Sequence, residues 1–530
     1  MSLGLVSFLV YQDSLNNDFI GFDDPLYVIH NPYITSFTWT NIQWMFGQIY
    51  LANWHPLTWL SHALDYALYG LEPWGHHLTN TLIHSLNVLL VFGLARTLII
   101  ISLPSQPPLL ASTIAAFLFA IHPQHVEVVA WISERKELLC TFFVLWSLLT
   151  YLFYTVTLKF IWYGISWFCF GLALLSKPMA VTLPVILFFL DIYPLKRTPL
   201  LVSTRITSSR ILLLEKIPFI ILTFIFIVIT LKAQPTIPIE LIDLKSRLLN
   251  VSNSLIAYIS KFLFPIHLSP FYPYPDYSLP QEYYRALSAV AAVILITLLS
   301  FYLWLKKQYY WLITWLIYLV TLSPVLGMIQ VGRQAMADRY AYLPTLPFYI
   351  LIGLGLSLIR PKYLKLISVG GICLVGISFI WLTQQQIKIW RQDLIFWNYI
   401  VSYAPHSVWA QHMLGDAYFN AQDYEKAIVH YESVRSFRVE NNHKKLALAY
   451  LRLNKFDEAL KVYQEMLHFD LDTHEYKDTI YMKMGWIYYQ QGLLKQAQYF
   501  VEQSLKINPH SKESRNLLIC MTVHKACPSE

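Results

Sequence analysis

The chain has 530 residues, of which 56% are hydrophobic and only 13% are charged. This balance, with a mean hydropathy of +0.44, excludes an ordinary soluble domain and is typical of an integral membrane protein. The net charge of +7 comes without a basic block interleaved with aromatic residues. We therefore expect basic cytoplasmic loops and no nucleic-acid partner. The five scattered cysteines form neither a disulfide framework nor a CxxC metal motif.

Long apolar runs predict an all-α, polytopic bundle of membrane helices over residues 1–389. Residues 3–11 are too short to cross a bilayer alone and are interpreted as the end of a first helix. With that helix the prediction is about eleven spans. The other candidate spans are residues 77–101, 109–121, 136–157, 160–175, 178–193, 217–232, 285–305, 309–325, 344–359 and 365–383.

Basic residues cluster after every second span, for example at Lys196, Arg197, Lys306 and Lys307. The positive-inside rule assigns those loops to the cytoplasm. The opposite, non-cytoplasmic side is the periplasm in a bacterium or the lumen of the endoplasmic reticulum in a eukaryote. It receives everything after residue 383, together with the external loops 12–76, 122–135, 233–284 and 326–343.

Residues 390–530 change to a polar, helical composition with an internal repeat. Small and aromatic residues recur at tetratricopeptide (TPR) offsets, as in Gly415, Tyr418 and Ala427. About three such repeats bury a continuous core, so we expect an α-solenoid domain. Its concave face favours recruitment of a protein or peptide partner, and the alternative is a stabilising appendage. The predicted repeats are 408–441, 440–473 and 478–511, followed by a capping helix.

Two adjacent carboxylates, Asp23 and Asp24, follow the first apolar segment directly. Ionisable side chains at a membrane are costly and usually functional, so the pair is a candidate catalytic site. A carboxylate there could take a proton from an acceptor hydroxyl group. The alternative is that the pair caps a short helix beginning at Pro25.

Two further external loops carry fixed cations, imidazoles and carboxylates. Arg and Lys side chains bind phosphate through charge-assisted hydrogen bonds, and a lipid phosphate would lie in the plane of these loops. The alternative for Arg135 and Lys136 is anchoring at the interface. A divalent metal ion is a possible cofactor, but no strong metal spacing is present, and histidines that only pack are the alternative. The candidate phosphate ligands are Arg135, Lys136, Arg333 and Arg339, and the candidate lining residues are His122, His125 and Glu127.

Several stretches together resemble one known family. They are "FIGFDDPLYVIHNPYI", "NWHPLTWLSHALDYALYGLEPWGHHLTNTLIHSLNVLLVF", "HPQHVEVVAWISERKE", "LALLSKPMAVTLPVILFFLDIYPLKR" and "ADRYAYLP", followed by the TPR segment. This combination resembles the transmembrane and tetratricopeptide repeat protein O-mannosyltransferases and their bacterial relatives, in the C-type glycosyltransferase (GT-C) superfamily. The resemblance covers nearly the whole chain.

The resemblance implies a polytopic enzyme that uses a polyprenyl-phosphate sugar on the non-cytoplasmic side. It places Asp23 and Asp24 at the catalytic centre, one as the base and the other as a residue that orients it or contacts a metal ion. It also adds Lys177 of "SKP" as a weaker phosphate ligand and His55 of "NWHP" as a lining residue.

The leading hypothesis is therefore transfer of a sugar from a polyprenyl-phosphate donor to a hydroxyl acceptor by direct displacement with inversion, with a protein as the expected acceptor. A non-catalytic membrane scaffold is one alternative, but a scaffold has no need of the acidic pair. A transporter of lipid-linked sugars is another, and it would place its ionisable residues at mid-membrane instead of at the ends of spans.

Overall fold

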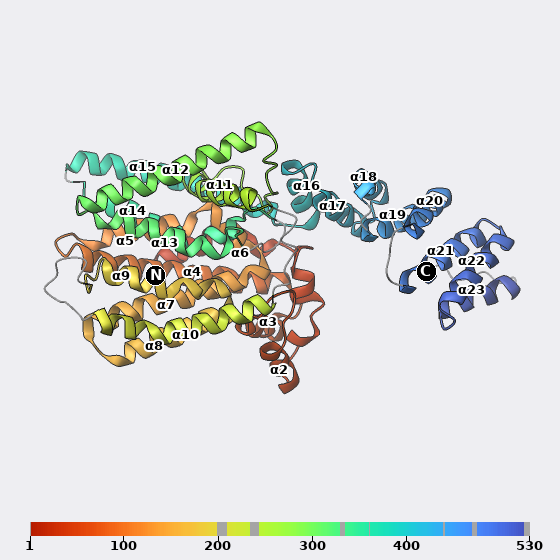
Figure 1. The fold of residues 1–530 in the computed structure, drawn as a ribbon, viewed down its shortest axis with the longest axis horizontal. Helices are drawn as coiled ribbons and strands as arrows, with labels where there is room; N and C mark the ends of the chain where they lie inside the picture. The colour runs from red at the N-terminus through yellow and green to blue at the C-terminus, as the bar shows by residue number, and fades with distance from the viewer. Residues whose placement is uncertain are drawn as a thin grey trace. The chain divides into compact units, whose positions relative to one another are not determined.

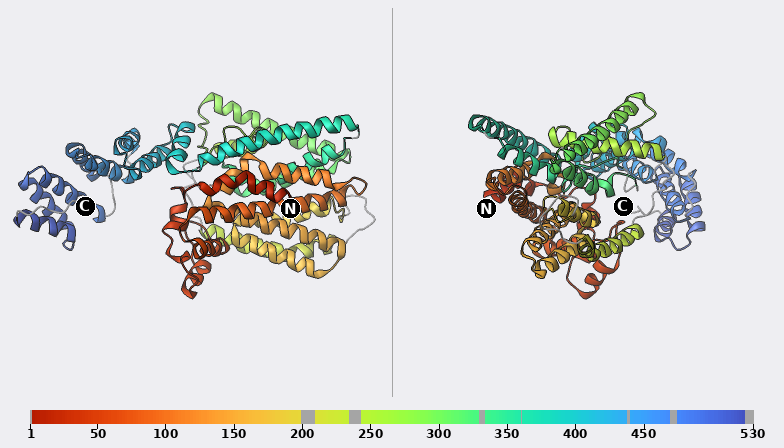
Figure 2. Two further views of the ribbon diagram at one scale, coloured as in Figure 1. Left: turned by 180° about the vertical axis from the view of Figure 1, so that it is seen from behind. Right: turned by 60° about the vertical axis from the view of Figure 1, so that its left-hand side comes forward.

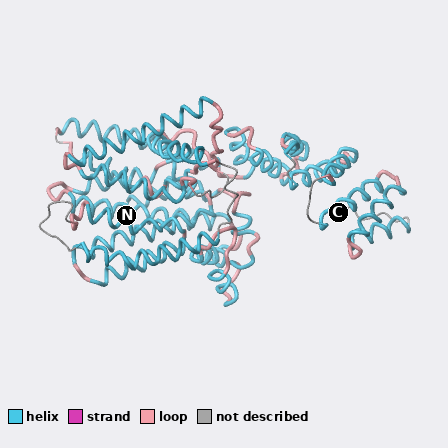
Figure 3. Tube along the Cα trace, in the orientation of Figure 1, coloured by secondary structure: helices cyan, strands magenta, loops and turns pink. Residues whose placement is uncertain are grey.

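A computed structural model describes residues 2–198, 209–233, 243–328, 334–359, 361–437, 440–468 and 474–523. Over these ranges the chain is helical, and its only β pairings are two isolated bridges, Tyr50 with Asn53 and Tyr272 with Met336 (Figure 3). The chain divides into two compact units, residues 1–396 and 397–530. The Arg333 predicted as a phosphate ligand lies outside the described residues.

Each apolar run of the sequence coincides with a helix of the first unit. The bundle is built from α1 (Ser2–Tyr11), α4 (Pro73–Ser102), α5 (Pro108–Ile121), α7 (Arg135–Thr157), α8 (Phe160–Ser176), α9 (Leu183–Ile192), α10 (Ser209–Ala233), α12 (Pro280–Leu305), α13 (Tyr309–Leu322), α14 (Leu346–Ser357) and α15 (Lys362–Ile389) (Figure 1). Helix α1 packs against α4 and α5, as the view from behind shows (Figure 2).

Five helical segments among the described residues are long and apolar enough to cross a membrane. A sixth span is possible if Pro108–Ile121 and Pro123–Ala130, which meet at 54°, are taken as one broken span. Four further apolar helices have only 10–17 residues. The chain is thus an integral membrane protein, but the predicted count of about eleven spans is not confirmed, since short helices do not reach across a bilayer by length alone.

Short helices in the predicted external loops gather at one end of the bundle. Helices α2 (Trp39–Gly47) and α3 (Pro56–Tyr69) lie between α1 and α4 in the chain, and α6 (Val126–Ala130) lies between α5 and α7. Figure 1 shows α3 and α6 at the same end. The amide of Asn80, near the start of α4, donates hydrogen bonds to the carbonyls of Val129 (3.3 Å) and Trp131 (3.1 Å). These bonds fix the segment that leads into α7.

An ion network holds α7, α9 and α10 together at the other end. The carboxylate of Asp191 accepts hydrogen bonds from the Tyr151 hydroxyl (2.8 Å) and from Lys216 Nζ (2.6 Å). Arg197 donates to Asp191 (3.0 Å) and to Glu215 (2.9 Å). The two cations and two carboxylates neutralise one another, so the network stabilises the bundle without leaving a free charge.

The second unit consists of helical hairpins. They are α17 (Val408–Asn420) with α18 (Tyr424–Ser433), α19 (Glu440–Arg452) with α20 (Phe456–Leu467), and α21 (His474–Gln490) with α22 (Leu494–Ile507), and α23 (Lys512–Val523) packs on the last one. A Cβ on Gly415 would lie 2.5 Å from the Tyr431 ring. This close approach explains the small residue at that repeat offset.

One cysteine among the described residues is paired. Cys520 is disulfide-bonded, whereas Cys140, Cys169 and Cys373 are free. A sequence with scattered cysteines does not reveal a bond of this kind, because pairing depends on positions in space.

Candidate functional site

Asp24 is fully buried and holds the loop after α1 against the segment before α7. Its Oδ2 accepts a hydrogen bond from the Ile20 amide (2.9 Å). Its Oδ1 accepts from the Ser133 amide (3.0 Å) and from the Ser133 hydroxyl. Asp24 stands at the N-cap position of the short helix Pro25–Ile29, but its side chain makes no capping bond. Burial raises the pKa of this carboxyl to about 7, against the opposing effect of the hydrogen bonds.

Asp23, in contrast, is partly exposed to solvent. Its side chain is 36% exposed, and its Oδ2 lies 3.9 Å from Lys136 Nζ. Partial burial of Asp23 raises its pKa, because the charged carboxylate loses contact with water. The positive charges of Lys136 and Arg339 partly offset this rise. Of the two neighbouring carboxylates, Asp23 is therefore the one that can reach an incoming hydroxyl group.

Lys136 lies between Asp23 and a second carboxylate. Its Nζ is 3.2 Å from Glu134 and lies over the rings of Tyr27 (4.8 Å to the centroid) and Trp131 (5.6 Å). The aromatic rings and the two carboxylates stabilise the charged ammonium group in a place that is otherwise largely shielded from water.

Glu134 is the centre of a group of cations that come from separate segments. Besides Lys136, it contacts Lys177 at 3.2 Å and the Nε of Arg339 at 3.5 Å. Lys177 follows the last residue of α8, and Arg339 lies in the short helix Asp338–Ala341 before α14. We call Lys136, Lys177 and Arg339 the cation cluster. The structure thus brings together three of the predicted phosphate ligands.

Each member of the cation cluster also has another acidic partner. Lys177 Nζ lies 2.7 Å from Glu137, and the guanidinium of Arg339 pairs with Glu127. The backbone amide of Arg339 donates a 2.9 Å hydrogen bond to the same Glu127 carboxylate. Glu127 therefore positions Arg339, whereas the sequence assigned it only to the lining of the site.

Arg135 does not join this group, although it precedes Lys136 directly. It is completely buried and donates to Asp65 (2.6 Å), to the Ser61 hydroxyl (2.9 Å), to the His76 carbonyl (2.8 Å) and to Asn80. All these partners come from α3 and α4. Adjacent residues on a helix point about 100° apart, so Arg135 ties helices together while Lys136 faces Asp23.

Ring nitrogens of the two histidines in the "HPQH" loop contact backbone groups inside the protein. The Nε2 of His122 lies 2.9 Å from the Phe262 carbonyl, and its Nδ1 accepts from the Gln124 amide. The Nδ1 of His125 lies 2.9 Å from the Phe119 carbonyl. No three His, Cys, Asp or Glu side chains among the described residues are grouped so that they could hold a metal ion.

His55 is buried beside the site, and neither of its ring nitrogens has a hydrogen-bond partner among the described residues. Its ring centroid lies 5.6 Å from that of Tyr27 and 4.6 Å from that of Trp59. Burial lowers the pKa of His55 well below its usual value, so the imidazole is neutral at neutral pH.

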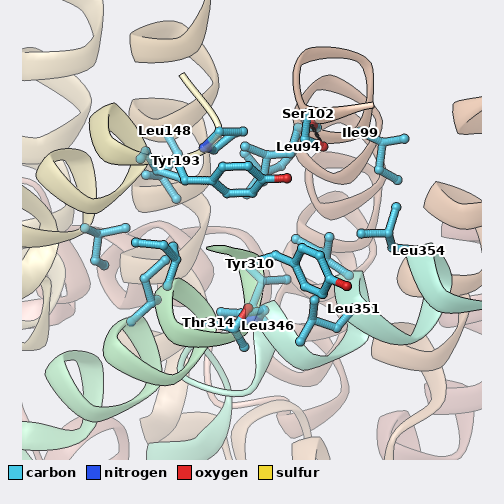
Figure 4. Close-up of a pocket in the computed structure, with 18 of the residues that line it drawn as sticks. Leu94, Ile99, Ser102, Leu148, Tyr193, Tyr310, Thr314, Leu346, Leu351 and Leu354 are labelled. Carbon is cyan, nitrogen blue, oxygen red and sulfur yellow. Dashed lines mark hydrogen bonds between the residues drawn. The ribbon is translucent and has the colours of Figure 1, made fainter. Parts of the chain in front are cut away.

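An apolar pocket of about 120 Å³ lies within the helix bundle (Figure 4). Its walls are α4, α7, α9, α13 and α14, and its lining includes Leu94, Leu148, Ile186, Ile317 and Leu351. Along α13 the lining extends from Tyr310 to Thr321, which corresponds to about 17 Å at 1.5 Å per residue. Figure 4 shows the rings of Tyr193 and Tyr310 on facing walls.

Sequence reasoning missed three residues of the site, namely Ser133, Glu134 and Glu137. All three belong to "ISERKE", in which only the Arg and Lys were expected to contribute to the site. The alternation of acidic and basic residues in this stretch could have predicted their role. When the start of an apolar helix is buried, its charged side chains need partners of opposite charge.

The chain is similar to known repeat domains and to known glycosyltransferases. Family models described as tetratricopeptide repeats match residues 410–434, 445–468 and 478–511. Protein O-mannosyl-transferase TMTC4 of Mus musculus is 34% identical over 164 residues, and Tmtc1 of Drosophila melanogaster is 44% identical over 86 residues. The human protein O-mannosyl-transferase TMTC2 is 29% identical over 208 residues, or 37% of this chain.

The chain is related to the TMTC protein O-mannosyltransferases. The resemblance and the TPR repeats predicted from sequence are thereby confirmed. The three alignments cover 22% of mouse TMTC4, 9% of fly Tmtc1 and 24% of human TMTC2. The TMTC relationship therefore rests on part of each relative.

Proposed function

We propose that this TMTC relative transfers a sugar from a polyprenyl-phosphate donor to a hydroxyl group of a protein, on the non-cytoplasmic side of the membrane. The observation that carries the proposal is the open carboxylate of Asp23, placed 3.9 Å from Lys136 at the edge of the cation cluster. A base for the acceptor and positive charge for a phosphate leaving group are then neighbours.

In the proposed reaction Asp23 Oδ2 removes the proton from the acceptor hydroxyl. The hydroxyl oxygen attacks the anomeric carbon of the sugar, and the bond from that carbon to the phosphate oxygen breaks. The electron pair of this bond stays on the phosphate, which remains attached to the polyprenyl chain. One displacement inverts the configuration at the anomeric carbon.

The cation cluster stabilises the negative charge that develops on the departing phosphate. Asp24 contributes by position: its bonds to Ile20 and Ser133 hold the loop that carries Asp23 against the start of α7. The possible metal ion considered from the sequence has no assigned ligands here, and no step depends on it.

The apolar pocket supports a lipid-linked donor. Helix α9 begins six residues after Lys177, α14 begins seven residues after Arg339, and both helices line the pocket. A hydrocarbon chain whose phosphate lies at the cation cluster would therefore have apolar walls within the bundle. We assign the pocket to part of the polyprenyl chain.

The TPR unit is proposed to recruit the protein acceptor on the same side of the membrane. Disulfides persist in oxidising compartments, so the bonded Cys520 supports a non-cytoplasmic TPR unit. Homologues named protein O-mannosyl-transferases favour mannose as the sugar and a protein as the acceptor.

The test is transfer of radiolabelled mannose from polyprenyl-phosphate mannose to a protein acceptor by the purified full chain in nanodiscs. Asp23→Asn should slow transfer by roughly 10²–10⁴-fold without reducing donor binding. The exposed Asp13, in the same external loop, provides a matched control, and Asp13→Asn should transfer at the wild-type rate. Transfer by Asp23→Asn at the wild-type rate with saturating donor would refute the proposed role.

A further inference from the structure

Glu134 is the most heavily engaged carboxylate of the site, yet the proposed reaction gives it no task. Its side chain is 1% exposed, and it meets Lys136 and Lys177 at 3.2 Å each and Arg339 at 3.5 Å. These partners come from the first turn of α7, from the end of α8 and from the segment before α14. A single carboxylate thus occupies the point on which the cation cluster converges.

Neither helix capping nor charge pairing accounts for a carboxylate at this point. Glu134 precedes α7 at the N-cap position, but its side chain makes no capping hydrogen bond. Each cation already has a second acidic partner, which is Asp23, Glu137 or Glu127 respectively. Pairing of the cations alone therefore does not require a fourth carboxylate at the centre.

We propose that Glu134 is an internal competitor of the phosphate group, and that it promotes release of the polyprenyl-phosphate product. This inference rests on the proposed function, because it assumes that the cation cluster meets a lipid-linked phosphate. A carboxylate and a phosphate both accept charge-assisted hydrogen bonds from Lys and Arg, so the two groups compete for the same donors.

The charges of donor and product explain why a competitor is useful. The donor phosphate is a diester with one negative charge, whereas the product is a monoester whose second ionisation has a pKa near 6. Without Glu134, the cation cluster would bind the more highly charged product more tightly than the donor, and this would slow turnover. The fixed negative charge of Glu134 opposes this preference.

The competitor role and a merely structural role predict opposite signs for Glu134→Gln. Removing the central negative charge should tighten binding of polyprenyl phosphate by about tenfold, lower the donor KM and lower kcat because release slows. If Glu134 only holds the cations in place, the same substitution should loosen them and weaken binding. Glu134→Asp keeps the negative charge but shortens the side chain by one methylene group. It should therefore increase the affinity for polyprenyl phosphate less than Glu134→Gln does.

The experiment measures the affinity of polyprenyl phosphate for the purified full chain in nanodiscs, by a fluorescent-analogue displacement assay, alongside product inhibition of transfer. Glu215→Gln is the matched control, because Glu215 is paired with Arg197 in the ion network at the other end of α7. It should alter stability but leave the affinity for polyprenyl phosphate unchanged.

Tighter binding in Glu134→Gln, with a smaller effect in Glu134→Asp, would support the inference. Weaker or unchanged binding would overturn it. If Glu134→Gln does not fold, the affinity of Glu134→Asp for polyprenyl phosphate is compared with that of the wild type instead, and again only tighter binding supports the inference. If the wild-type chain binds polyprenyl phosphate but does not transfer mannose, the proposed transferase function is refuted. The comparison of polyprenyl-phosphate affinity between wild type and Glu134 variants still tests the role of Glu134. Absence of binding in the wild-type chain overturns the inference directly.

Discussion

Arg135 and Lys136 are adjacent cations for which the structure predicts opposite consequences of substitution. Arg135→Gln removes the guanidinium that pairs with Asp65 at 2.6 Å and leaves that buried carboxylate beside the His76 ring (3.6 Å) and the Thr79 hydroxyl (2.8 Å). Breaking a buried ion pair by removal of one partner costs about 3–5 kcal/mol. For a unit of this size such a loss lowers the melting temperature by roughly 4–6 °C.

Lys136→Gln removes a charge at the candidate site itself. Glu134 keeps Lys177 and Arg339 as partners, so the free energy of unfolding should fall by only about 1 kcal/mol. Transfer should nevertheless slow by at least about tenfold, because a cation beside the leaving phosphate and the base is lost.

The assay combines thermal unfolding of each variant in nanodiscs with steady-state transfer of labelled mannose at varied donor concentration. Arg135→Gln should reduce the melting temperature with little change in donor KM for the protein that remains folded. A normal melting temperature with a raised donor KM in Arg135→Gln would refute the assignment of its side chain to α3 and α4.

Four further outcomes are expected. The transfer rate should rise with pH through a pKa above the usual range for a carboxyl, because Asp23 acts when deprotonated and burial raises its pKa, and Asp23→Asn should remove this rise. Ile186→Phe, which narrows the pocket, should raise the KM for long-chain donors, whereas Val185→Phe on the exposed side of the same helix should not. Cys520 should resist a membrane-impermeant maleimide until the protein is reduced. Deleting residues 397–530 should abolish transfer to a protein while preserving transfer to a small acceptor, and unchanged transfer to the protein would contradict recruitment.

The parts of the structure that depend on local periodicity could be predicted from the sequence. The TPR offsets identify the repeats because Gly415 and its equivalents must be small for two helices to approach. Apolar runs likewise locate the helices of the first unit. Their number as membrane spans could not be fixed, because a helix of 10–17 residues is compatible with a short span or with a buried helix.

The roles within the candidate site depend on long-range contacts, which one sequence does not show. Asp23 and Asp24 are the same residue type in adjacent positions. What distinguishes the buried Asp24 from the partly exposed Asp23 includes the hydrogen bond of Asp24 with Ser133, 109 residues away in the chain. The direction of Arg135 followed from helix geometry and could have been anticipated. The convergence of Lys177 and Arg339 on Glu134 could not, because it joins three separate segments.

The crossing of α5 and α14 has a consequence for distant positions. At Gly353 a Cβ would lie 2.2 Å from the backbone oxygen of Ala111, so the two helices meet through their main chains. Any side chain there must push α14 away from α5, and no rotation of a neighbouring group can relieve the overlap. Because α14 follows the segment that carries Arg339, a substitution at this one buried glycine should also displace Arg339. The effect of a substitution in this protein therefore depends on which helices it displaces, as well as on its distance from the candidate site.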